Sequence, residues 1–389
     1  MQIHKESLLI YEDIQRSEQA VFNHKIKISF KFDYSPNITI NFGDFSDEPY
    51  RIVMMDRGSN QVIYESQLST GLFCMAYRRW ISDLDILVYN SSGDLVKIFN
   101  LFKILKTGKV IIAVESSSLG DTLAWVPYIK KFVERHNCSD ANITTFWNHI
   151  FHEESQNIKF RHPGWRDSDY DVLIGVGWYD ENDRNYHPKD PRTCNLQEVA
   201  ADILGVDYSG DIRPILNFKP DKPPTDEKYI CIAPAATSGF KLWQRHDGWK
   251  DLCFALSQRG YKIYNLSKEN WEIPGAVNIP PSDINVPMNY IYHSEFVIGL
   301  GSGLSWLSWA MYKHVVMIAN FSDPITEFQT GITRIVNKSV CNSCWNNTDY
   351  RFDRSWLWCP IHKDTDRHFE CSKEISPEMV MEKIEHLLS

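Results

Sequence analysis

Residues 109–125, KVIIAVESSSLGDTLAW, contain the most informative pattern of this 389-residue sequence. A continuous apolar run is followed by a serine-rich loop and then by a stretch with helical spacing. An apolar run without alternation is typical of a strand buried on both faces, as in a parallel sheet covered by helices. We therefore predict an α/β fold of the doubly wound kind, which binds ligands at the carboxyl ends of its strands.

The strand–loop–helix pattern returns in the second half of the chain, after the proline-rich linker DKPPTDEK. Residues 228–243 read KYICIAPAATSGFKLW, and residues 295–313 read EFVIGLGSGLSWLSWAMYK. Two Rossmann-like halves are therefore predicted, at 104–222 and 223–389. Two such halves facing each other form a cleft suited to a nucleotide-linked substrate. A final helix is predicted in SPEMVMEKIEHLL, with Ser376 as its N-cap.

Residues 1–103 show a different pattern, in which apolar and polar residues alternate. In KIKISFKF (25–32), isoleucine and phenylalanine alternate with lysine and serine, which is the period of a half-buried strand. Further short apolar runs follow, separated by turn-rich segments such as DRGSN and SSGD. This region is predicted to form an N-terminal antiparallel β module, either an open sheet or a small barrel.

The overall charge and hydropathy argue against two kinds of partner. The chain holds 41 Lys and Arg against 50 Asp and Glu, a formal net charge of −9, which disfavours nucleic acid as a partner. No apolar run reaches the roughly 20 residues that a membrane-spanning helix needs, and no secretory signal is visible at the start. We expect a cytoplasmic protein without membrane insertion.

Four of the nine cysteines lie close together near the carboxyl terminus, namely Cys341, Cys344, Cys359 and Cys371. An odd total in a cytoplasmic chain argues against a disulfide framework. A CxxC pair followed by two more cysteines predicts a four-thiolate metal finger over 341–371, closed to water and therefore structural. The spacing alone favours zinc over iron. His362 and His368 are alternative ligands within this segment.

Three loops carry the candidate catalytic and binding residues. Gly120 and Asp121 follow the first buried strand, where a carboxylate is either a helix cap or a general base displayed into the cleft. Lys241 follows small residues after the strand KYICIAP, a position suited to phosphate or, alternatively, to a solvated surface lysine. The turn GLGSGLS (299–305) either admits a phosphate to a helix N-terminus or only permits close packing.

These loops, the N-terminal β module and the four-cysteine segment together resemble the bacterial autotransporter heptosyltransferases, over essentially the full length. This resemblance implies a GT-B glycosyltransferase that transfers heptose from ADP-heptose to serine hydroxyls of autotransporter adhesin passenger domains before export. It further implies Asp121 as the general base, iron rather than zinc in the finger, no catalytic metal, and a large homo-oligomer such as a dodecamer. The substrate-binding positions that it implies are Gly120, Thr237, Lys241, Ser302, Gly303 and Leu304.

The turn at 299–305 departs from the pattern of the wider lipopolysaccharide heptosyltransferases. Their turn usually reads Asp-Ser-Gly with a histidine three residues later, whereas Gly301 and Trp306 occupy those positions here. This difference favours the protein-modifying branch. Two alternatives remain: another GT-B sugar-nucleotide transferase of the lipopolysaccharide type, and a non-catalytic assembly protein that uses its metal finger to hold a partner.

Overall fold

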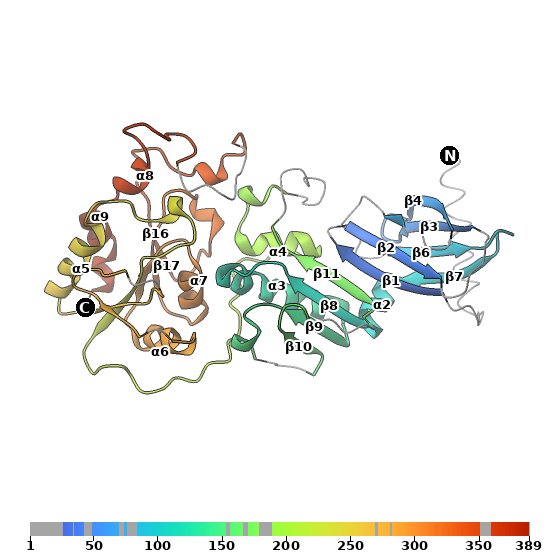
Figure 1. Cartoon of the computed structure of the whole chain (residues 1–389), viewed down its shortest axis with the longest axis horizontal. Helices are drawn as coiled ribbons and strands as arrows, with labels where there is room; N and C mark the ends of the chain where they lie inside the picture. The colour runs from blue at the N-terminus through green and yellow to red at the C-terminus, as the bar shows by residue number, and fades with distance from the viewer. Residues whose placement is uncertain are drawn as a thin grey trace.

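In the computed structural model, the described strands form three β-sheets arranged along an elongated molecule (Figure 1). The described residues are 26–33, 35–42, 49–69, 74–75, 84–152, 156–165, 170–178, 189–268, 271–280, 282–350 and 359–388; for 26–42 and 74–75 only the backbone is described. The sheet nearest the carboxyl terminus lies at one end of the molecule, and the N-terminal strands lie at the other.

The first α/β half is built on a seven-stranded sheet with the order β10-β9-β8-β11-β1-β2-β5. Its central strands, β8 to β11, pair in parallel, as the unbroken apolar run at 109–114 predicts. Helices α3 and α4 pack against each other beside this sheet. The bounds are β8 (Lys109–Val114), α3 (Leu119–His136), β9 (Asp140–Thr144), β10 (Ile158–Arg161), β11 (Val172–Val176) and α4 (Leu196–Leu204).

The second half has a six-stranded sheet with the order β14-β13-β12-β15-β16-β17, and every neighbouring pair is parallel. The α/β prediction is therefore confirmed for both halves, and Ser376 caps the last long helix by accepting from the Met379 amide (3.3 Å). The strands are β12 (Tyr229–Ala233), β13 (Lys262–Asn265), β14 (Val277–Asn278), β15 (Val297–Gly299), β16 (Val315–Ile318) and β17 (Ile332–Ile335). The helices are α5 (Gly248–Gln258), α6 (Asn285–His293), α7 (Gly303–Ala310), α8 (Glu370–Lys373) and α9 (Pro377–Ile384).

The N-terminal strands divide between two sheets. A four-stranded antiparallel sheet has the order β4-β3-β6-β7, and α2 (Leu101–Thr107) leads from it into β8. The remaining strands extend the seven-stranded sheet, because β1 pairs in parallel with β11. Strand pairing thus crosses the boundary predicted at residue 103, and the domain division stays a prediction. The bounds are β1 (Ile26–Asp33), β2 (Ser35–Phe42), β3 (Tyr50–Asp56), β4 (Gln61–Leu68), β5 (Cys74–Met75), β6 (Leu84–Tyr89) and β7 (Leu95–Asn100).

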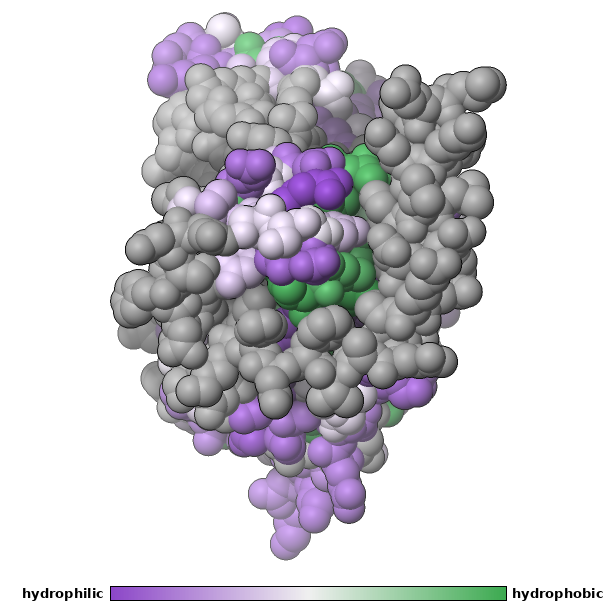
Figure 2. Space-filling model, turned by 90° about the vertical axis from the view of Figure 1, so that its right-hand side faces the viewer, coloured by the Kyte–Doolittle hydropathy of each residue, from purple (hydrophilic) through white to green (hydrophobic). Residues whose placement is uncertain are grey.

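Strands β3 and β6 are buried on both faces. Ile52 and Ile86 belong to the main core, whereas Val53 and Leu87 form a separate apolar cluster on the opposite face. Figure 2 views this end of the molecule, where apolar side chains are visible beside strongly polar ones. Among the described segments, each helix is too short or too polar to cross a lipid bilayer.

Candidate active site

Asp121 lies in the first turn of α3, at the carboxyl end of β8. Ser118 is the N-cap, and its hydroxyl accepts a hydrogen bond from the Asp121 amide (3.4 Å). The cap role considered for Asp121 therefore belongs to Ser118. Oδ2 of Asp121 accepts hydrogen bonds from Ser116 Oγ (2.6 Å) and from Trp178 Nε1 (2.8 Å). Since Trp178 follows β11, two neighbouring strand ends hold one carboxylate.

The surroundings of Asp121 raise the pKa of its carboxyl above the ordinary value, chiefly because burial disfavours the charged form. The hydrogen bonds from Ser116 and Trp178 and the positive charge of Lys241 act in the opposite direction and lower the same pKa. A carboxylate with a raised pKa is a stronger base, and Asp121 as a residue is only partly buried. The arrangement suits proton abstraction from a bound hydroxyl.

Lys241 approaches this carboxylate from the other half of the molecule. It ends the 3₁₀ turn η4 (Gly239–Lys241), after β12, and its charge is close enough to act on Asp121. Phe240 anchors the turn, because its buried ring packs against Phe321 with centroids 4.4 Å apart. Within the described part of the chain, the Lys241 ammonium makes no hydrogen bond or ion pair. Thr237, in the loop before η4, is exposed.

The N-termini of α3 and α7 touch each other where the two halves meet. A Cβ added to Gly303 would lie 2.9 Å from Leu119 Cβ and 3.2 Å from the Gly120 nitrogen. A Cβ on Gly120 would lie 3.3 Å from Trp306 Cδ1 and 3.5 Å from Gly303 Cα. Position 303 therefore requires glycine for the helices to approach this closely, and a side chain at position 120 would be tightly packed. The structure brings Gly120, Asp121, Lys241 and Gly303 together at one edge of both sheets.

The turn before α7 offers unpaired polar groups. Ser302 is the extended N-cap residue, but its side chain makes no capping hydrogen bond. Its Oγ is buried and has no hydrogen-bond partner among the described residues. Gly303 and Leu304 open the helix, where backbone N–H groups lack intrahelical acceptors, and the Leu304 side chain packs against the main core. A helix N-terminus with such groups is suited to an anion.

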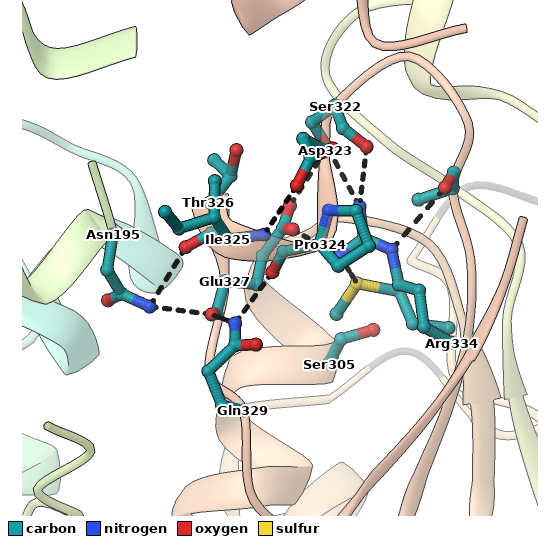
Figure 3. A network of polar contacts seen from close by, with 12 residues as sticks. Asn195, Ser305, Ser322, Asp323, Pro324, Ile325, Thr326, Glu327, Gln329 and Arg334 are labelled. Atoms are coloured by element: carbon teal, nitrogen blue, oxygen red, sulfur yellow. Dashed lines mark hydrogen bonds and ion pairs between the residues drawn. The ribbon is translucent and has the colours of Figure 1, made fainter. Parts of the chain in front are cut away.

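A loop between β16 and β17 joins the two halves through a polar network (Figure 3). Glu327 and Arg334 form an ion pair whose side chains are 8% and 9% exposed. Arg334 also donates to the carbonyl and the hydroxyl of Ser322, each at 3.0 Å. From the first half, the Asn195 amide donates to the carbonyls of Ile325 (3.2 Å) and Glu327 (2.6 Å). The loop is therefore held from both sides of the cleft.

The four cysteines predicted as ligands are all free thiols, and Cys344, Cys359 and Cys371 are buried. Burial, together with the other cysteines of this group, raises the pKa of Cys344 and of Cys371 to about 12. This mutual influence places the four sulfurs in one neighbourhood. The Cys359 sulfur also accepts a hydrogen bond from the His362 amide (3.2 Å). Thiols gathered in this way suit a cation, which stabilises the deprotonated form.

The most compact set of donor atoms in this segment differs from the four-sulfur set. Among the described residues, Cys341, His362 and Glu370 place their ligand atoms within 4.8 Å of one another. A possible metal-binding group is therefore present in the segment, with one of the predicted cysteines in it. His362 was an alternative ligand in the sequence, whereas Glu370 carried no sign of this role.

The structure adds two residues to the predicted site, Ser116 and Trp178. Ser116 belongs to the serine-rich loop after β8. The sequence predicts that it lies in a loop, but does not predict its hydrogen bond to Asp121. Trp178 ends a different strand segment, and only the pairing of β8 with β11 brings its indole to Asp121. No local pattern in the sequence predicts that contact.

Comparisons with known proteins identify relatives of the whole chain. No protein-family model matches the chain. The autotransporter heptosyltransferase BAHTCr of Citrobacter rodentium is 31% identical over 364 residues, covering 88% of this chain and 87% of that protein. The autotransporter heptosyltransferase Aah of Escherichia coli is 29% identical over 350 residues, covering 86% and 88% of the two chains.

A solved structure extends the likeness to the fold. The crystal structure of the dodecameric iron-containing heptosyltransferase TibC of E. coli, in complex with ADP-D-β-D-heptose, matches with a TM-score of 0.81 and 27% identity. The match covers 95% of this chain and 97% of that one. An inactive autotransporter heptosyltransferase, BimC of Burkholderia thailandensis, is 25% identical over 92% of this chain, so activity must be argued from site residues. By its identity and coverage with BAHTCr, this chain belongs to the autotransporter heptosyltransferases.

Proposed function

We propose that this chain transfers heptose from ADP-heptose to serine hydroxyls of an autotransporter adhesin passenger domain, with Asp121 as the general base. One observation carries the proposal: beside the Gly120–Gly303 contact, a lysine of the second half lies close enough for its charge to act on a carboxylate of the first half. The relatives named as heptosyltransferases, and the ADP-heptose bound in TibC, support the choice of donor.

In the proposed step, the serine oxygen attacks the anomeric carbon of the heptose as the bond from that carbon to the phosphate oxygen breaks. Asp121 takes the serine proton, and ADP leaves with the bonding electron pair. A positioned base of this kind contributes about 10²–10⁴-fold to the rate. A single carboxylate base suits inversion at the anomeric carbon, because it acts on the face opposite to the leaving group.

The second half supplies the groups proposed to hold the leaving ADP. Charge builds up on the pyrophosphate as the bond breaks, and preorganised donors stabilise it. We assign this role to Lys241 and to the helix N-terminus at Ser302, Gly303 and Leu304. The buried Ser302 hydroxyl, which has no partner in the described part of the chain, supports the assignment, because a phosphate oxygen would satisfy it. Thr237 adds a hydroxyl from the neighbouring loop, and Gly120 leaves room at the α3 terminus.

The cysteine segment is proposed to be a structural metal finger held by Cys341, Cys344, Cys359 and Cys371, with iron as the metal, as in iron-containing TibC. A bound metal would cross-link the segment and supply no step of the transfer. The finer fold assignment belongs to the same proposal: a GT-B enzyme with an N-terminal β module and this finger. The proposed enzyme acts in the cytoplasm, as a large homo-oligomer like dodecameric TibC.

The donor and acceptor can be tested by co-expression with a serine-containing passenger fragment. The host is used in two forms, one that makes ADP-heptose and one that lacks it. We expect heptose-sized mass increments on the fragment only in the first host, located on serines by fragmentation that preserves the glycan. Increments of another sugar size would contradict the donor, and increments on residues other than serine would contradict the acceptor.

A further inference from the structure

The indole of Trp178 holds the Asp121 carboxylate, and the Trp178 ring also contacts residues of both halves of the molecule. Trp178 Nε1 donates to Asp121 Oδ2 at 2.8 Å. The same ring packs against Trp125 of α3, with centroids 5.7 Å apart and planes at 58°. Trp178 is partly buried and belongs to the apolar residues packed on the main core. The orientation of its N–H is therefore set by what the ring touches.

The cysteine segment contributes one of those contacts. Trp345 lies in the 3₁₀ turn η6 (Cys344–Asn346), directly after Cys344. Its ring meets Trp178 edge to face, with centroids 5.9 Å apart and an interplanar angle of 87°. Edge-to-face pairs prefer this geometry and resist rotation of either ring. The segment that carries Cys344 thus reaches across to the residue that holds the Asp121 carboxylate.

The same segment also supports Lys241 on the other side. The Trp345 amide donates to the Phe321 carbonyl (3.0 Å), and the two rings lie 6.1 Å apart. Phe321 packs against Phe240, which precedes Lys241 and shares a buried cluster with Cys344. One short segment therefore packs toward both groups that the proposed reaction needs.

We propose that Trp178 and Trp345 are positioning residues. They connect the cysteine segment (341–371) to Asp121 and keep the Asp121 carboxylate at a fixed position relative to Lys241. The proposal rests on the proposed role of Asp121. It gives the cysteine segment a task in the transfer reaction that needs no contact with either substrate.

The chemistry of the Trp178 contact makes the coupling measurable. The indole N–H stabilises the charged carboxylate, and it lowers the pKa of Asp121 against the effect of burial. Removing that N–H leaves the Ser116 hydroxyl and the charge of Lys241 facing the carboxylate, so the pKa rises further. Since the deprotonated form is the active base, the acid limb of the pH profile moves to higher pH.

The test is the pH dependence of kcat/KM for transfer by the full-length enzyme. Trp178→Phe keeps a ring and removes the N–H, and we expect an acid limb at higher pH and about tenfold lower kcat/KM near neutrality. Trp345→Leu removes the edge-to-face contact and is expected to move the limb in the same direction, while Trp345→Phe stays closer to wild type. Trp249→Phe in α5, which alters the edge-to-face pair of that ring with Trp243, is the matched control and leaves the profile unchanged.

The double variant Trp178→Phe/Trp345→Leu isolates the coupling. If Trp345 acts through the Trp178 N–H, the double variant shows the same limb as Trp178→Phe alone. A further shift in the double variant, or a wild-type limb for Trp178→Phe, overturns the proposal. Transfer by Asp121→Asn at the wild-type rate would instead overturn the general-base assignment. Thermal unfolding and metal content identify a misfolded variant. A partly inactive preparation does not imitate the predicted shift, because the midpoint of a pH profile does not depend on the fraction of active enzyme.

Discussion

The contact between the two helix N-termini predicts a large effect for one added methyl group, in Gly303→Ala. Gly303 opens α7 with ordinary helical backbone, so alanine is disfavoured only by its surroundings. Its Cβ would lie 2.9 Å from Leu119 Cβ, whereas carbon atoms normally approach to about 3.5–4.0 Å, so the starts of α3 and α7 must move apart by about 0.6–1.1 Å.

That displacement has two consequences of different size. Overpacking of this kind costs about 1–3 kcal/mol of folding stability, which a domain of this size tolerates. Misplacement of reacting groups by about 1 Å costs on the order of 10²-fold in rate. We therefore expect Gly303→Ala to remain folded and to lose about 10²-fold in kcat/KM, because Asp121 and Lys241 no longer meet at the right distance.

The assay is ADP release in the presence of a passenger fragment, with urea unfolding measured on the same preparations. Gly58→Ala is the matched control, since a Cβ there meets only Asp56 Oδ1 at an ordinary 3.4 Å. Wild-type kcat/KM for Gly303→Ala would refute the claim that the Gly120–Gly303 contact sets the geometry of the cleft.

Three further changes test other parts of the structure. Arg334→Met leaves the Glu327 carboxylate buried and unpaired, and should lower the free energy of unfolding measured in urea by about 3–5 kcal/mol. Adding Glu327→Gln to the same chain should partly restore it. An unchanged midpoint for Arg334→Met alone would contradict the structural role of the pair. Cys344→Ser should lower the metal content measured by plasma mass spectrometry, whereas Cys253→Ser in the core of the second half should not; equal metal in both variants would remove Cys344 from the ligand set. Lys241→Met should weaken ADP binding about tenfold in calorimetry, as expected for one lost charged contact to phosphate. Lys250→Met, at an exposed lysine, should leave the affinity unchanged. Wild-type affinity for Lys241→Met would contradict the assignment of Lys241 to the phosphate site.

The sequence patterns predicted the strand–loop–helix units because those units are local. The run at 109–114 is apolar without alternation, and β8 is accordingly paired on both sides. The sequence predicts a serine-rich loop that includes Gly120 and Asp121, with the helix starting at Thr122. The helix instead begins at Leu119, because Ser118 caps it, and so it includes Gly120 and Asp121. Pro127 predicts that this helix is either broken or kinked, and the structure shows that it is not broken. The helix continues to His136, since burial along α3 offsets the hydrogen bond that proline cannot donate.

The features that the sequence did not predict depend on distant contacts. The parallel pairing of β1 with β11 joins segments far apart in the chain. The alternation of apolar and polar residues at 25–32 does not indicate which strand β1 pairs with. The indole of Trp178 reaches Asp121 only through the fold, so a list of candidate residues drawn from local motifs omits it.

The most direct test of the account is the intact mass of a passenger fragment co-expressed with wild type, Asp121→Asn or Asp251→Asn in a host that makes ADP-heptose. Asp251 is the matched control because it also lies in the first turn of a helix, α5, but is exposed. We expect heptose-sized increments with wild type and Asp251→Asn, and transfer reduced by about 10²–10⁴-fold with Asp121→Asn. Equal increments with all three proteins would contradict the general base, and no increments with any of them would contradict heptose transfer to that fragment.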